Sequence, residues 1–187
     1  MRTAITTEGE LRELLGQPMQ RVLDKDRPSF HPEHRAFVAA SPFCLVATSD
    51  ATGRCDVSPK GDPAGFGLVV DDTTLAIPER PGNKRADGFS NILQNPHVGL
   101  IFFVPGRGDT LRVNGRATLL ADAPYADQMV VKGHKPVVIL EVAVEHGDEE
   151  AGHPDRDAHP GPAARLQQRL DPGDQGVVRR DADAEGR

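Results

Sequence analysis

Tryptophan is absent from this chain of 187 residues, only one tyrosine is present, and aromatic residues make up 4% of it. The core must therefore be built from aliphatic side chains and a few phenylalanines. No apolar run approaches the roughly 20 residues that a helix needs to span a bilayer. The first residues also lack the apolar segment of a signal peptide. We therefore expect a cytoplasmic protein with no membrane partner.

Cysteine and positive charge are also scarce. The formal net charge is -6 at pH 7, which argues against a nucleic-acid partner. The two cysteines, Cys44 and Cys55, flank a turn, and pairing of Ser49 with Arg54 would place Cys55 opposite Thr48. This register predicts two free thiols rather than a disulfide, and two cysteines alone predict no metal site.

Short apolar runs separated by turn residues dominate the middle of the chain, which is typical of antiparallel strands. The runs that we expect to be strands are 43–48, 54–57, 65–70, 73–78, 98–104, 111–119 and 137–144. Short helices are expected after a capping box at Thr7 and Glu10, and at 33–40, 87–94 and 124–131. This order predicts a mainly β protein with short helices, whose antiparallel sheet of about six strands closes into a small barrel.

The composition changes after residue 145. The segment 146–187 is rich in Gly, Pro, Asp and Arg and contains only four large aliphatic residues. It cannot bury enough apolar surface to offset a chain entropy of about 1–2 kcal/mol per residue. We therefore divide the chain into a helical lead-in at 1–41, a barrel domain at 42–145 and a disordered tail at 146–187.

A basic loop at 80–85 lies between an expected strand and an expected helix. Arg80, Lys84 and Arg85 surround Gly82, which lets the backbone approach a ligand closely. The helix that follows would supply free amides and the positive end of its dipole. Arginine can also hold a phosphate at two points. The loop therefore predicts phosphate binding, and a solvated basic turn is the alternative that the spacing leaves open.

A polar row follows one face of the expected strand 111–119. Arg112, Asn114 and Arg116 alternate with apolar residues, so they point to the same side of the sheet. This row can face a ligand, or it can be the solvated face of the sheet. Gly115 within the row predicts a bulge or a close approach of another backbone.

Two other kinds of candidate group carry less information. In the segment 58–62, a lysine at the end of a strand and before a glycine can reach over a planar ligand, although a plain turn explains it as well. The seven histidines match no zinc spacing. No Ser-His-Asp or Cys-His set can be assigned from sequence order. No catalytic acid or base is predicted.

Taken in order, these segments resemble the pyridoxamine 5'-phosphate oxidase-related flavoproteins, the FMN-binding split-barrel family. The resemblance covers about 11–144, and the segments that carry it are 41–43, 56–62, 77–85, 91–96 and 110–116. It implies an antiparallel split β-barrel that forms a homodimer. It also implies one FMN at each of two sites built from both subunits.

The resemblance also implies residue roles. Lys60 matches a family lysine beside the flavin, and 80–85 matches the region that binds the FMN phosphate. Thr110 matches a polar residue at the start of the strand beside the isoalloxazine ring. The cofactor-binding residues implied in this way are Ser58, Lys60, Arg80, Asn83, Lys84, Arg85, Thr110, Arg112 and Asn114.

The implied function is that of an FMN-dependent oxidoreductase acting on an unknown small molecule. The alternatives are a non-catalytic flavin or haem carrier, and a pseudo-enzyme without a ligand. From His146 onward, the aromatic and histidine-containing segment of the family is replaced by the Gly/Pro/Asp/Arg-rich tail. We hypothesise that this tail is an out-of-frame translation of a GC-rich gene. The missing C-terminal arginine and histidine argue against a true pyridoxamine phosphate oxidase.

Overall fold

The computed structural model describes residues 2–18, 28–82 and 84–150. Most of the expected tail, 151–187, and the expected cofactor-binding residue Asn83 therefore lie outside the described residues. Within the described ranges, no helix has both the length and the apolar character needed to cross a bilayer.

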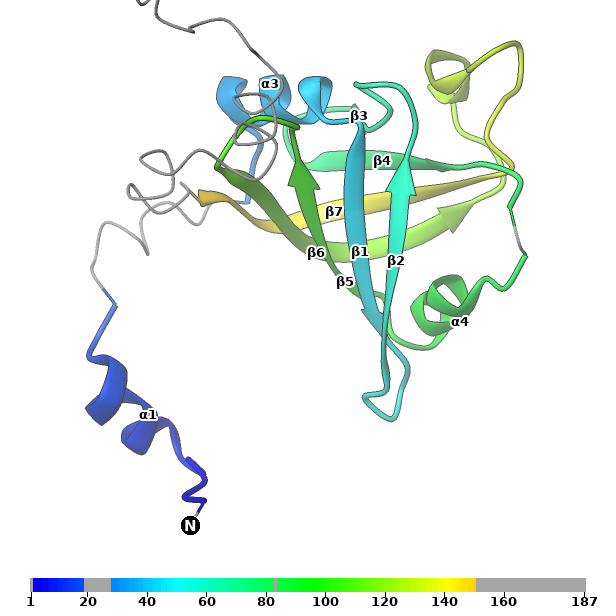
Figure 1. Ribbon diagram of the computed structural model, residues 1–187. Coiled ribbons are helices and arrows are strands. Elements are labelled where there is room, and N and C mark those ends of the chain that lie inside the picture. The colour runs from blue at the N-terminus through cyan, green and yellow to red at the C-terminus, as the bar shows by residue number, and fades with distance from the viewer. Residues whose placement is uncertain (1, 19–27, 83, 151–187) are drawn as a thin grey trace, which may run out of the picture. The chain divides into compact units, whose positions relative to one another are not determined.

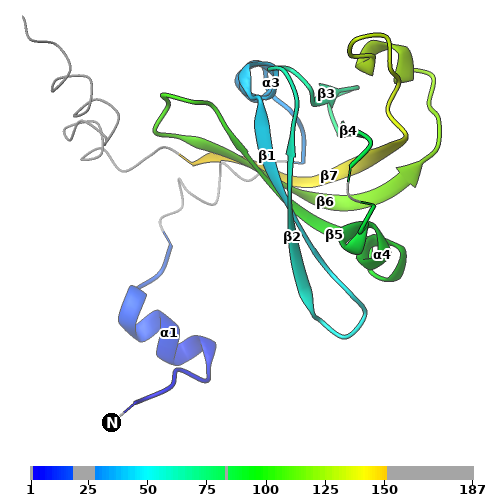
Figure 2. The same ribbon diagram turned by 45° about the vertical axis from the view of Figure 1, so that its right-hand side comes forward.

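One antiparallel sheet forms the body of the protein, and Figures 1 and 2 show that it curls into a half-barrel. Its strand order is β2-β1-β5-β6-β7-β4-β3. The strands are β1 (Phe43–Ser49), β2 (Cys55–Gly61), β3 (Leu68–Val69), β4 (Thr74–Glu79), β5 (His97–Phe103), β6 (Thr110–Leu120) and β7 (Val138–Glu150). The prediction of a mainly β, antiparallel barrel-type fold is confirmed. The sheet has seven strands where about six were expected, and the run expected at 65–70 is reduced to the two residues of β3.

The helices are short, as the sequence predicts. They are α1 (Glu8–Leu15), α3 (Pro32–Ala40), α4 (Asp87–Gln94) and the single 3-10 turn η1 (Ala126–Met129). The capping box of α1 is confirmed, because the Glu10 amide donates to the Thr7 hydroxyl at 3.3 Å and the Glu10 carboxylate accepts from the Thr7 amide at 3.2 Å. The helix expected at 124–131 is reduced to η1.

The core is aliphatic with a few phenylalanines, as the composition predicts. Phe37 of α3 packs among side chains from the concave face of the sheet, including Phe102 of β5 and Leu111 of β6. Each of these three side chains is almost completely buried. Burial of a side chain of this size stabilises the fold by roughly 1.5–3 kcal/mol. The central strands β5 and β6 are therefore firmly anchored.

Gly115 lies at an irregularity in the ladder between β6 and β7, where the register shifts between Asn114 and Gly115. A Cβ atom at this glycine would lie 2.1 Å from the carbonyl oxygen of Ala143 in β7. The predicted bulge and close backbone approach are therefore both confirmed.

Both cysteines are free, as predicted. The register behind that prediction is wrong by one residue, because Ser49 pairs with Cys55 and the turn takes in Arg54. Cys44 is buried opposite Lys60, whereas Cys55 is exposed.

β7 continues to Glu150, past the strand end expected at Val144 and past the expected domain boundary at 145. Residues 146–150 pair with 110–114 of β6. The expected boundary followed the loss of apolar side chains. A ladder is held by backbone groups, however, and polar residues can extend it.

Candidate ligand-binding site

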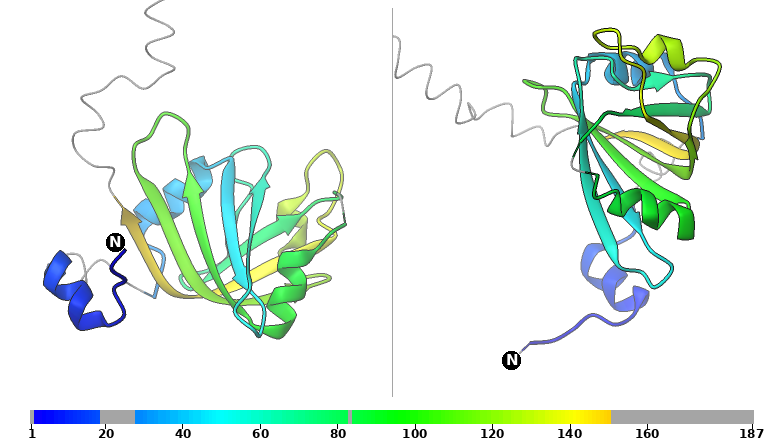
Figure 3. Two further views of the ribbon diagram at one scale, coloured as in Figure 1. Left: turned by 60° about the horizontal axis from the view of Figure 1, so that its bottom comes forward. Right: turned by 90° about the vertical axis from the view of Figure 1, so that its right-hand side faces the viewer.

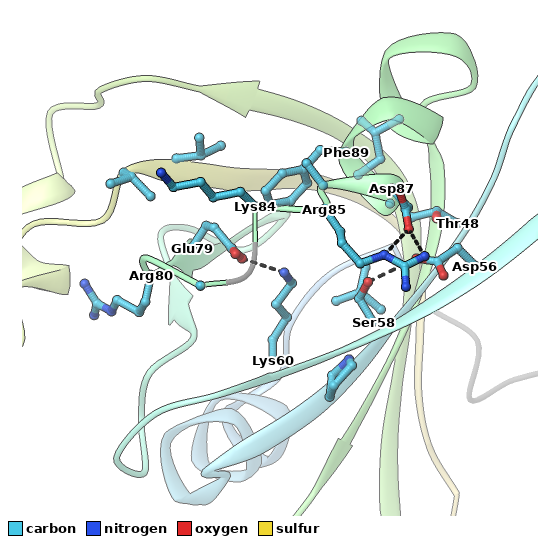
Figure 4. Close-up of a pocket in the computed structure, with 18 of the residues that line it drawn as sticks. Thr48, Asp56, Ser58, Lys60, Glu79, Arg80, Lys84, Arg85, Asp87 and Phe89 are labelled. Atoms are coloured by element: carbon cyan, nitrogen blue, oxygen red, sulfur yellow. Dashed lines mark hydrogen bonds and ion pairs between the residues drawn. The ribbon is translucent and has the colours of Figure 1, made fainter.

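The sheet curls so that β2 comes near the end of β4 (Figure 3). A cavity of about 740 Å³ lies there (Figure 4). These strands are far apart in the sheet, because β1, β5, β6 and β7 stand between them. The remaining described walls come from two residues of β1, from 80–82 and 84–86 of the loop, from α4, and from Val137 and Val138. The cavity therefore exists only because the sheet curves.

Two ion pairs connect β2 and its end to β4 and its end beside this cavity. The Lys60 ammonium lies 2.5 Å from the Glu79 carboxylate, with 17% and 26% of the two side chains exposed. The Arg80 Nε lies 2.7 Å from the Asp62 carboxylate. The other nitrogens of Arg80 donate to backbone carbonyl oxygens of Met129 and His134 at 2.7 and 3.3 Å. Arg80 therefore holds the loops around the cavity together.

The basic loop enters α4 through an unusual backbone. Lys84 and Ala86 both adopt left-handed conformations, with φ of 60° and 56°. For residues other than glycine such conformations cost about 1–3 kcal/mol each and cluster at functional sites. Ala86 is also the N-cap of α4, and its side chain cannot accept a hydrogen bond. The first amides of α4 consequently have no capping side chain and can receive an anion.

The charges at this entrance differ in how they are paired. Arg85 donates through Nε and Nη2 to the Asp87 carboxylate, at 2.9 and 2.6 Å. The Arg85 side chain is 76% exposed, so this pair is a weak surface interaction. Lys84 is exposed and has no ion-pair partner among the described residues. Lys84 is therefore the cation most available to a ligand.

The cavity also has an apolar side. The Lys60 ammonium lies 4.8 Å from the centre of the Phe89 ring. Val46 and Ile92, together with Val137 and Val138, complete the apolar part of the lining. A ligand with one anionic end and a planar apolar body matches this distribution.

α4 is packed closely onto β1 and β2. A Cβ atom at Gly88 would lie 3.4–3.5 Å from polar atoms of the Asp56, Ser58 and Thr48 side chains. The Ser58 hydroxyl donates to the Asp56 carboxylate at 3.1 Å, and the Asn91 amide donates to the Thr48 hydroxyl at 3.1 Å. These contacts set the position of the helix start relative to β2.

Cys44 of β1 is the cross-strand partner of Lys60 in the β1–β2 ladder. Burial raises the pKa of its thiol to about 12, while the nearby charge of Lys60 acts in the opposite direction. The thiol is therefore protonated at neutral pH and is not a nucleophile.

The structure brings together five of the nine residues expected to bind the cofactor. Those that line the cavity are Ser58, Lys60, Arg80, Lys84 and Arg85. The three expected residues of β6 are not part of the lining, and Asn83 lies outside the described residues. Those β6 residues are Thr110, Arg112 and Asn114.

The polar row on β6 does have the predicted alternation. Arg112, Asn114 and Arg116 are exposed, and the residues between them, Val113 and Gly115, are buried. Asn114 covers Gly99 of the neighbouring strand, where a Cβ atom would lie 3.0 Å from its side-chain oxygen. Within one chain this row and the cavity are therefore separate.

Sequence reasoning missed the carboxylates of the cavity, Glu79, Asp56 and Asp87, and the ring of Phe89. Glu79 directly precedes the basic loop, and Asp87 follows it after Ala86. This acidic flanking of a cationic loop was the one signal available. Nothing in the sequence order indicated that Glu79 would meet Lys60.

The profile of the family described as pyridoxamine 5'-phosphate oxidase matches residues 30–151 of this chain. The chain belongs to this family. The resemblance inferred from the sequence is therefore confirmed, and the split barrel of the family is the fold that the curled sheet forms.

Solved structures of the same fold agree with this assignment. A candidate pyridoxamine 5'-phosphate oxidase from Lactobacillus delbrueckii is 22% identical, with a TM-score of 0.52 over 66% of this chain and 98% of that chain. The HupZ protein of Group A Streptococcus is 20% identical, with a TM-score of 0.51 over 63% of this chain and 91% of that chain. At this identity the likeness shows the fold alone. No curated protein matches the chain.

Proposed function

We propose that the cavity binds FMN and that the protein is an FMN-dependent oxidoreductase acting on a small molecule. The observation that carries the proposal is a cationic helix start beside an apolar cavity in a member of this family. The volume of about 740 Å³ lies within the roughly 300–1,000 Å³ of cofactor and ligand sites.

The residues present fit the two ends of this cofactor. Lys84, Arg85 and the uncapped amides of α4 would hold the phosphate, since all of them favour an anion. Phe89 and Val137 would contact the ring system, and Ser58 offers it a hydroxyl. The bound flavin would supply the redox chemistry, while the chain supplies binding and orientation.

We include a homodimer in this proposal. Thr110, Arg112 and Asn114 do not line the cavity of their own chain. A second copy could present these residues to the site, which accords with their exposed or partly exposed positions on β6. The sedimentation velocity of the full chain, with and without FMN, tests this part of the proposal. A protein that stays monomeric when saturated with FMN would contradict it.

The nearest competing function is a flavin carrier without catalysis. It is favoured by the ion pairs of the lining, since two carboxylates that could transfer a proton, Glu79 and Asp87, are bound to Lys60 and Arg85. A haem carrier is less well supported, because the same described lining offers none of the usual axial ligands.

The absorbance spectrum of the purified full chain, with mass determination of any released molecule, tests the proposal. FMN that is reduced by a nicotinamide donor and reoxidised by a substrate supports the oxidoreductase. Bound FMN that neither step affects supports the carrier. A colourless protein that cannot be reconstituted with FMN refutes both. The cytoplasmic compartment stays a prediction from the sequence.

A further inference from the structure

The cavity contains more charge than one phosphate requires, but most of it is already neutralised. Its described lining includes four cationic side chains, Lys60, Arg80, Lys84 and Arg85, and three carboxylates, Asp56, Glu79 and Asp87. Three of the cations pair with carboxylates: Lys60 with Glu79, Arg80 with Asp62, and Arg85 with Asp87. The cavity is therefore suited to one strongly anionic group and not to two.

The Lys60–Glu79 and Arg85–Asp87 pairs occupy different parts of the cavity wall (Figure 4). The first joins β2 to the end of β4 beside the Phe89 ring, and the second lies at the start of α4. The charged groups of Lys60 and Glu79 are 2.5 Å apart, and neither side chain is more than 26% exposed. The partial removal of water strengthens their attraction. Arg80, the neighbouring cation, is held by Asp62 and two backbone carbonyl oxygens. A second anionic group placed here would meet the Glu79 carboxylate, and the two cations described at this place, Lys60 and Arg80, are already paired.

We propose that Glu79 is a specificity-determining residue that excludes anionic substrates from this side of the cavity. The substrate is then uncharged or cationic where it faces the Lys60–Glu79 pair, and it is not a phosphate ester at that position. The inference rests on the proposed function, since it assumes that the cationic helix start is occupied by the FMN phosphate. It also gives a reason for the contact of Lys60 with Glu79: lysine is a common phosphate ligand, and here its ammonium is bound to a carboxylate instead.

The carboxylate has a second consequence for substrate choice. Each carboxylate oxygen can accept more than one hydrogen bond, so Glu79 keeps acceptor capacity after binding Lys60. A substrate N–H group or ammonium placed beside Glu79 would find an acceptor there. An oxyanion would find a repelling charge.

The test counts inorganic phosphate bound per full-length chain by equilibrium dialysis at low ionic strength, with and without FMN. For the wild type we expect one phosphate, at the helix start, which FMN displaces. For Glu79→Gln we expect a second phosphate that FMN does not displace, bound at least tenfold more tightly than any second phosphate of the wild type. This gain should disappear when Lys60→Met is combined with Glu79→Gln.

The controls separate charge from folding. Glu33→Gln removes an exposed carboxylate of α3 and should behave as the wild type. Thermal unfolding of each variant tests whether it is folded. If Glu79→Gln does not fold, Glu79→Ser takes its place in the experiment. The proposal is overturned if neither substitution adds a phosphate, or if the FMN-loaded wild type already binds one that Lys60→Met removes.

The two proposals can fail separately. A wild type that does not bind FMN refutes the proposed function. A Lys60-dependent phosphate gained by Glu79→Gln would still support the role of Glu79. FMN binding without any such gain refutes the role of Glu79 alone.

Discussion

Replacement of Lys84 by alanine should weaken FMN binding without weakening riboflavin binding. Lys84 is the cation of the cavity without an ion-pair partner among the described residues, so its substitution breaks no ion pair within them. A hydrogen bond to a charged group contributes about 1.5–3 kcal/mol. Because Lys84 is exposed before binding, we take the lower value, about 1.5 kcal/mol, which corresponds to a roughly tenfold rise in Kd.

Arg85→Ala should have a smaller effect than Lys84→Ala. Arg85 must first give up or share its contact with Asp87, a surface pair that contributes about 0–1 kcal/mol. Part of its attraction for a phosphate is therefore offset by the lost pair. Lys84→Ala should therefore raise the Kd for FMN more than Arg85→Ala does.

The assay is a titration of flavin fluorescence with FMN and, separately, with riboflavin, which has no phosphate. Lys132→Ala is a matched control, because Lys132 is also an exposed lysine with a left-handed backbone, φ 52°, and it does not line the cavity. If Lys84→Ala weakens FMN and riboflavin equally, the loop is structural. If it weakens neither, the phosphate does not bind at the start of α4.

Three further predictions concern the frame of the site. Gly115→Ala should lower the free energy of unfolding in urea by about 1–3 kcal/mol, since its Cβ would lie 2.1 Å from a β7 carbonyl oxygen; an unchanged midpoint would contradict the close approach. A thiol reagent should modify Cys55 rapidly in the folded protein and Cys44 only on unfolding, because Cys44 is buried and burial raises its pKa to about 12; two fast thiols would contradict this. Burial and a hydrogen bond to Glu141 raise the pKa of Tyr125, so its hydroxyl stays protonated to a higher pH in the folded state than in the unfolded state. Unfolding free energy should therefore fall as pH rises above about 10, and less steeply in Tyr125→Phe; equal slopes would show that Tyr125 contributes nothing.

The elements most readily predicted were those whose signals are local. The helix expected at 87–94 has the observed bounds of α4, because Asn95 and Pro96 prevent its continuation. The capping box of α1 depends on two residues three positions apart, and at Gly115 the residue type alone marked the place where β7 comes close to β6. In contrast, the end of β7 was misplaced because its last pairs are set by β6 and not by its own side chains.

The candidate site divides in the same way. The cationic loop, the glycine within it and the helix after it are visible in the chain order, and they predict an anion near residues 80–87. The partners of those cations are not visible. Asp62 and Glu79 reach Arg80 and Lys60 only because the sheet curls and brings β2 near β4.

Residue types and their order therefore predict that this protein holds an anionic group. The cations, backbone amides and glycine that favour an anion all lie within one short segment, so they are close together in any fold. On our proposal for Glu79, the number of such groups that the cavity accepts follows from ion pairs between distant strands. That number depends on the curvature of the sheet, which arises from packing across the whole core and is encoded in no single segment. The curved sheet also separates the polar row of β6 from the cavity within one chain.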